Sequence, residues 1–173
     1  LARSLGCKYQ YDAKHAASVE KLSLLLFDKL VKVHGLQERD RFILQTAAIL
    51  HDIGKFVSLR THYYYSYRLI GSSDILGFSD TEKTIMANVA YYHSKGAPAS
   101  TDLNLASLTV NQKITVAKLA AIIRMADALD RTHRQKMTAC DVALRGDELM
   151  ITVDSQEDFS LEEWTFADKA DFF

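Results

Sequence analysis

The chain has 173 residues, of which 48% are hydrophobic and 25% are charged, and its formal net charge is −1. A chain of this length forms one domain, or one domain with a small appendage, and can bury a sizeable core. The near-neutral charge excludes a general affinity for nucleic acid or anionic membranes, so anion binding has to come from a local basic cluster. No apolar run approaches the roughly 20 residues that span a bilayer.

The two cysteines, Cys7 and Cys140, have no cysteine or histidine at metal-finger spacing. We therefore expect two reduced thiols in a cytoplasmic protein with no membrane or nucleic-acid partner. The sequence opens at Leu1 rather than Met and stops at Phe172-Phe173 without a polar tail. These two ends predict a piece of a longer protein.

Helix breakers are scarce, with one proline, Pro98, and seven scattered glycines, which favours a helical protein. Apolar residues at three- and four-residue steps predict a long helix over Tyr11–Val33, ended by Gly35. The same spacing predicts a second helix over Glu38–Leu50, and a third helical segment follows Thr61.

The second half of the chain changes from helical to strand-like patterning. Ser79 with a glutamate three residues later is typical of a helix start and predicts a helix to about residue 93. Residues 94–111 are loop-like, and Lys113–Arg134 is the most apolar helix of the chain. Alternating residues over 139–144 and 149–153 predict a β-hairpin, and residues 154–173 a strand and the start of a helix.

His51-Asp52 ends an apolar helix where the chain breaks at Gly54. An imidazole and a carboxylate side by side there can reach one ion, and these ligands suit Mn, Fe, Co, Ni or Zn rather than Ca; Mg also stays a candidate. A lone His-Asp pair carries little weight. The alternative is a histidine that caps the helix beside a solvated aspartate.

Two residues on other helices strengthen the metal interpretation. Asp127 lies in the most apolar helix, where a carboxylate is costly unless a cation or hydrogen-bond donors compensate it. His15 is flanked by alanines on the first long helix. With the His-Asp pair, these side chains can surround one ion in a bundle core. The alternatives are a core histidine and a surface aspartate, and we expect Asp130 to be of the surface kind or to make a local ion pair.

This order of residues on helices resembles the HD superfamily of metal-dependent phosphohydrolases. A closer similarity is to the C-terminal HD-like domain of the exopolyphosphatase / guanosine pentaphosphate phosphohydrolase (Ppx/GppA) family. The matching stretches are residues 25–30 (LLFDKL), 34–36 (HGL), 47–54 (AAILHDIG), 70–71 through 77–79, 92–95 (YHSK) and 119–133 (LAAIIRMADALDRTH). Together they cover nearly the whole chain and are highly specific.

The resemblance implies a mainly α fold. Residues 1–136 would form the HD-type helical bundle, and residues 137–173 a small strand-containing C-terminal subdomain. It further implies N-terminal actin-like domains in the same full-length chain, which in the family carry the polyphosphate chemistry. The HD-like part would then extend the polyphosphate channel, form a homodimer or sense a nucleotide.

One departure from the family pattern bears on the metal. Where the family often reads His-His-Lys-His-Ser, this chain reads His62-Tyr63-Tyr64-Tyr65-Ser66. Tyrosine is a poor ligand at neutral pH because its pKa is about 10, so we expect one divalent ion rather than two. We place His62 and Tyr65 at the rim of the pocket.

Basic residues near these positions are candidates for phosphate binding: Lys55, Arg131 and Arg124. The alternative for each is a solvated charge or an ion pair, and for Arg124 that alternative is favoured. His93 is either a helix-end histidine or a pocket residue and proton donor, and Asp52 a proton acceptor. The sequence thus predicts a metal-dependent phosphohydrolase acting on a nucleotide, polyphosphate or another phosphate ester. The alternative is a non-catalytic module that binds polyphosphate or a nucleotide, regulates or dimerises.

Overall fold

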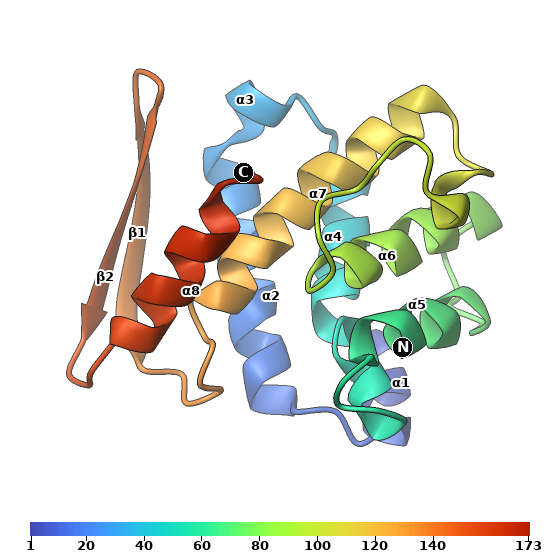
Figure 1. Ribbon diagram of the computed structural model, residues 1–173, viewed down its shortest axis with the longest axis horizontal. Coiled ribbons are helices and arrows are strands. Elements are labelled where there is room, and N and C mark those ends of the chain that lie inside the picture. Colours follow the sequence, from blue (N-terminus) through green and yellow to red (C-terminus); the bar gives the residue numbers. More distant parts are fainter.

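The helices and the hairpin are arranged as Figure 1 shows, in a computed structural model that describes residues 1–173. The elements, in chain order, are α1 (Ala2–Lys8), α2 (Ala13–Lys29), α3 (Val31–His34), α4 (Glu38–Leu50), η1 (Ile53–Phe56), α5 (His62–Gly71), α6 (Asp80–Tyr92), η2 (Leu103–Leu105), α7 (Val110–Ala128), β1 (Met137–Arg145), β2 (Glu148–Ser155) and α8 (Ser160–Ala170). The predicted mainly α fold with a C-terminal hairpin is confirmed.

The hydrophobic core lies where α2, α4, α6 and α7 pack against one another. Leu44, Leu50, Met86 and Ile123 are fully buried there. The apolar spacing that predicted these helices is therefore the spacing of their core-facing residues. None of the helices has the length and apolar composition needed to cross a membrane.

Helix boundaries follow local signals more closely than the apolar pattern. The predicted helix over residues 11–33 is divided at Leu30, where α2 ends and the short α3 begins. Ser79 caps α6 through the predicted capping box with Glu82. The helix predicted to reach Arg134 ends at Ala128, and α1 was not predicted.

The hairpin and α8 pack against the helical bundle. β1 pairs antiparallel with β2, and Arg145 faces Glu148 across a turn in which Gly146 has a φ of 61°. Val142 of β1 is buried in the main core, β1 contacts α2, and α8 contacts α7. Figure 1 shows α8 lying alongside α7, and this placement brings α8 side chains to the site described next.

Candidate metal centre

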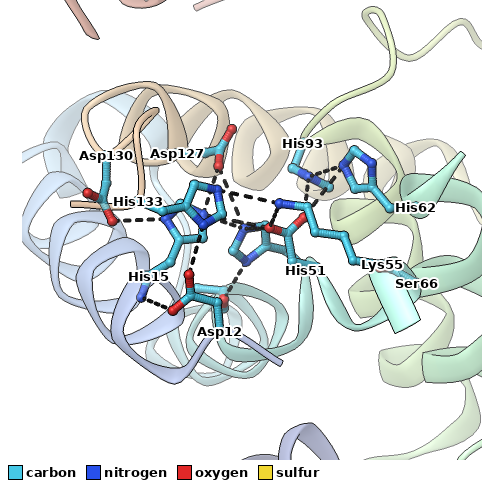
Figure 2. Close-up of polar contacts among 12 residues, drawn as sticks. Asp12, His15, His51, Lys55, His62, Ser66, His93, Asp127, Asp130 and His133 are labelled. Carbon is cyan, nitrogen blue, oxygen red and sulfur yellow. Dashed lines mark hydrogen bonds and ion pairs between the residues drawn. The ribbon is translucent and has the colours of Figure 1, made fainter. Parts of the chain in front are cut away.

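The four predicted ligands lie in the interior of the bundle, and Figure 2 labels three of them: His15, His51 and Asp127. His15 comes from the first turn of α2, His51 and Asp52 from the end of α4, and Asp127 from the last turn of α7. The Nε2 atom of His15 lies 3.2 Å from Nε2 of His51 and 3.2 Å from Oδ1 of Asp127. Oδ2 of Asp52 is 3.5 Å from Nε2 of His51. Ligand atoms of His15, His51 and Asp127 therefore form one group within 4.8 Å of one another, and Asp52 forms another such group with His51 and His93.

Three imidazoles make the same kind of hydrogen bond to the backbone, and this bond determines which ring nitrogen is free to bind a metal. In each, Nδ1 lies within hydrogen-bond distance of the carbonyl oxygen three residues earlier: His51 with Ala48 at 2.7 Å, His62 with Leu59 at 3.0 Å and His93 with Ala90 at 2.5 Å. Because a carbonyl only accepts, Nδ1 carries the hydrogen, and in the neutral ring Nε2 keeps a lone pair. All three lone pairs face the centre, as metal ligation requires.

Asp130 orients the fourth imidazole and does not face solvent as expected from the sequence. It is 1% exposed, and its Oδ2 accepts a hydrogen bond of 2.9 Å from Nδ1 of His15. The backbone and side-chain nitrogens of Gln135 also donate to it. Because α7 ends at residue 128, the chain turns back before Asp130 and carries this carboxylate inward. A carboxylate behind a ligating histidine raises the basicity of the ligand.

The carboxylate of Asp52 is buried, and an ammonium group reaches only one of its two oxygens. The residue is 7% exposed, and neither carboxylate oxygen has a hydrogen-bond partner. Its closest cation is Lys55, whose Nζ lies 2.5 Å from Oδ2 as an ion pair. A buried carboxylate is unfavourable unless a cation or donors compensate it. The donor set, with no ammonium group at Oδ1 of Asp52, therefore fits a divalent cation.

Without a metal, three side-chain cations balance three carboxylates. Burial alone would raise the pKa of Asp127, but the nearby Lys169 and His15 hold it well below its usual range. Lys169 reaches across from α8, with Nζ 2.5 Å from Oδ2 of Asp127. Burial lowers the pKa of His15, yet its bonds to Asp127 and Asp130 raise it to about 9. His15 is then protonated at neutral pH and joins Lys169 and Lys55 as the third cation.

A second pair of imidazoles lies at the other oxygen of Asp52. Nε2 of His62 and Nε2 of His93 are 3.3 Å apart, and each is 3.5 Å from Oδ1 of Asp52. The single-ion prediction rested on two tyrosines that replace imidazoles in this region. Since His62 and His93 supply imidazoles here, that reason no longer holds. Tyr65 packs against Tyr64 and does not line the cavity at the centre.

His93 lies at the C-terminal end of α6, as the helix-end alternative expected, and it is also an interior residue, 1% exposed. Burial lowers its pKa to about 4, against the raising effect of Asp52. A neutral ring whose only hydrogen is on Nδ1, bonded to the Ala90 carbonyl, offers a lone pair and no proton. The predicted role as proton donor does not fit this geometry, and a ligand role does.

Gly54 explains why α5 comes so close to the His-Asp pair. A Cβ atom at this position would lie 2.1 Å from the His62 carbonyl oxygen and 2.4 Å from the Ser66 nitrogen. The Gly54 N–H donates to Oγ of Ser66 at 2.9 Å. The glycine therefore lets the start of α5 rest on η1, and this contact places His62 beside Asp52.

Two cavities open next to the centre and share Asp52, Lys55 and His133. One, of about 450 Å³, is also lined by His62, His93, Asp127 and Arg131, with side chains of α8. The other, of about 480 Å³, is lined by Tyr9, Tyr11, Asp12 and Phe56. Arg131 is exposed in the first cavity, as its predicted role in phosphate binding requires. Arg124 lies elsewhere: it donates to the carbonyls of Tyr92 and Lys95, so it supports the loop after α6.

No sequence pattern predicted a role for His133, which lines both cavities together with Asp52 and Lys55. Its ring stacks on His15 with centroids 3.6 Å apart, and its Nδ1 lies 3.0 Å from Oδ2 of Asp12. Its φ of 56° is in the left-handed region, which is uncommon for a residue other than glycine. Such a conformation persists only where the surroundings hold it. The motif at residues 119–133 contained this residue, but no spacing rule marked it.

Comparison with known proteins shows the family of the chain. The family described as Ppx/GppA phosphatase, domain III, matches residues 2–168. The chain belongs to the Ppx/GppA phosphatase family. It is similar to a protein of Vibrio vulnificus (strain YJ016) named guanosine-5'-triphosphate,3'-diphosphate pyrophosphatase, with 26% identity over 90% of this chain. A protein of the same name from Aeromonas hydrophila is 28% identical over 88% of it. The chain spans only 31% and 30% of the length of these two relatives.

Proposed function

We propose that this domain III is an HD-type, metal-dependent phosphohydrolase module. His15, His51, Asp52 and Asp127 would hold one divalent ion, and His62 with His93 and the second oxygen of Asp52 would hold a weaker second one. The observation that carries the proposal is the pairing of facing Nε2 atoms, 3.2 Å apart in one pair and 3.3 Å in the other. Two lone pairs so close repel unless a proton or a metal ion lies between them.

The metal would supply Lewis-acid polarisation of a phosphoryl oxygen and make water more acidic. The chain supplies charge around it: Lys55 and Arg131 line the 450 Å³ cavity and would bind the phosphoryl oxygens, where they stabilise developing negative charge. Burial raises the pKa of Asp52, but its contacts with His51, His93 and Lys55 hold it well below its usual range. Asp52 is therefore better suited to a ligand role than to the proton-acceptor role expected from the sequence.

The substrate would be a nucleotide or another phosphate ester or anhydride. What supports this is family membership together with the printed names of the relatives, which are pyrophosphatases of a guanosine nucleotide. N-terminal actin-like domains of a full-length chain, and a second copy in a homodimer, would be the protein partners.

The second candidate function is a non-catalytic module that binds polyphosphate or a nucleotide, regulates or dimerises. One observation favours it: Lys55 and Lys169 already contact the two ligand carboxylates, at 2.5 Å each. A centre neutralised by its own side chains needs no ion to fold. Metal would then have to compete with these ammonium groups.

Elemental analysis of the chain purified without chelator tests the metal proposal. We expect one Mn, Fe, Co, Ni, Zn or Mg ion per chain, with a second only at higher metal concentration. His51→Ala should abolish binding. His34→Gln is the matched control, because His34 is also buried and hydrogen-bonded but lies outside the centre, so it should lose stability and keep its metal.

A metal-free protein whose Tm is unchanged by added metal would refute an intact site. Incubating the metal-loaded chain with nucleoside di- and triphosphates and measuring released phosphate then separates the two functions. Turnover that His51→Ala abolishes supports the enzyme, whereas tight binding without turnover supports the module.

A further inference from the structure

One wall of the 450 Å³ cavity differs chemically from the rest. Its polar part is formed by carboxylates and imidazoles of the metal centre, together with Lys55 and Arg131. The remaining wall includes Trp164 of α8 and Leu59 of the segment before α5. These two side chains are 69% and 76% exposed. Two exposed apolar side chains thus adjoin a site suited to phosphate.

Packing within the chain does not account for the position of Trp164. Its neighbours on α8, Glu162 and Thr165, are buried at 1% and 7% exposure and hold the helix against the protein. The indole has no aromatic ring pair and no side-chain cation against it, although tyrosines and histidines of the chain form many such pairs. Large aromatic side chains exposed beside a pocket are typical of ligand-binding surfaces.

We propose that Trp164 is the residue that recognises the base of a nucleotide, with the base lying flat on the indole and the phosphates extending toward Lys55 and Arg131. This inference rests on the proposed phosphate-binding function and names its substrate class. Every base has a π-face that stacks on an aromatic side chain. A cavity of about 450 Å³ is within the usual range for small-molecule sites. A chain of phosphates without a base would make no contact with the indole ring.

The sequence makes this contact directly measurable, because Trp164 is the only tryptophan. Intrinsic fluorescence of the metal-loaded chain should be quenched by GDP and by ADP. Pyrophosphate, which has no base, should bind by calorimetry and leave the emission unchanged. Trp164→Ala should weaken GDP binding about tenfold or more and leave pyrophosphate affinity as in the parent. Trp164→Phe should restore most of the GDP affinity.

Leu161→Ala is the matched control, since Leu161 is another exposed apolar residue of α8, 47% exposed and outside the cavity lining. It should bind both ligands as the parent does. Equal GDP affinity in the parent and Trp164→Ala would overturn the base contact while leaving the phosphate site intact. Equal losses of affinity for GDP and for pyrophosphate in Trp164→Ala would also overturn it, because Trp164 would then only support the structure of the site. If neither ligand binds the metal-loaded parent, the proposed function fails as well.

Discussion

Asp130→Asn tests whether the buried carboxylate behind His15 sets the metal affinity. Asp130 is 1% exposed and accepts from Nδ1 of His15 at 2.9 Å. Asparagine keeps the shape and can still accept, but the hydrogen bond loses its charge assistance, which accounts for about half of its strength. Changes to such partners of ligating histidines typically cost about tenfold to hundredfold in metal affinity. We expect a loss in this range.

The size of the effect on stability follows from mass action. With free metal at about 100 times its dissociation constant, binding stabilises the folded chain by about 2.7 kcal/mol, and after a tenfold loss of affinity by about 1.4 kcal/mol. For a chain of this length the difference corresponds to about 3–5 °C in Tm. The assay is the metal-induced rise in Tm, together with a calorimetric metal titration. Asp147→Asn, in the exposed hairpin turn, removes the same charge and serves as the control. Unchanged affinity in Asp130→Asn would refute the reasoning.

Three further outcomes are expected. Gly54→Ala should lower Tm and metal content together, because its Cβ would lie 2.1 Å from a carbonyl oxygen at the start of α5; normal metal content would show that α5 does not position the centre. Lys169→Met should raise metal affinity several-fold by calorimetry, since an ammonium 2.5 Å from Asp127 repels a nearby ion; a weaker site would mean that Lys169 orients the ligand. Protein from which a chelator has removed the metal should have its highest Tm near pH 6.5. The pKa of His15 is raised to about 9, so its contribution to stability is lost as pH rises toward 9. The pKa of His93 is lowered to about 4, so its contribution is lost as pH falls toward 4. A Tm that rises steadily from pH 6.5 to 9 would contradict this.

Motifs on regular helices were the part of the site that the sequence could predict. His51 and Asp52 end one apolar helix, and His15 and Asp127 lie on two others, so burial of the apolar faces brings all four inward. Helical periodicity predicts which residues face the core. It therefore predicts side chains that converge within a bundle, without any knowledge of the loops.

Residues after the end of α7 were the part that could not be predicted. The end of α7 at Ala128 was placed six residues too late, and this error put Asp130 on a helix surface when it lies inside a turn. Lys169 meets Asp127 across 42 residues of chain, and Trp164 reaches the cavity on the same helix. No periodic pattern relates α8 to the centre, because its position depends on how the hairpin packs against α2.

The division of labour within the family leads to a last prediction: this chain alone should not hydrolyse long-chain polyphosphate. Phosphate loops of the actin-like fold are glycine-rich turns whose backbone N–H groups face the phosphates. The only strands here form one antiparallel hairpin, and its turn glycine, Gly146, leads into the second strand. The phosphate-binding groups that remain are the basic side chains Lys55 and Arg131 beside the metal centre, which suffice for a small phosphate ester.

Incubation of the metal-loaded chain with polyphosphate, followed by measurement of released phosphate, checks this directly. We expect no steady release, while a nucleoside diphosphate in parallel reports whether the centre is active at all. Steady turnover of polyphosphate that His51→Ala abolishes would assign the exopolyphosphatase chemistry to the helical centre. In that case glycine-rich loops would not be required, because four imidazoles and two basic side chains would suffice for processive hydrolysis of a phosphate chain.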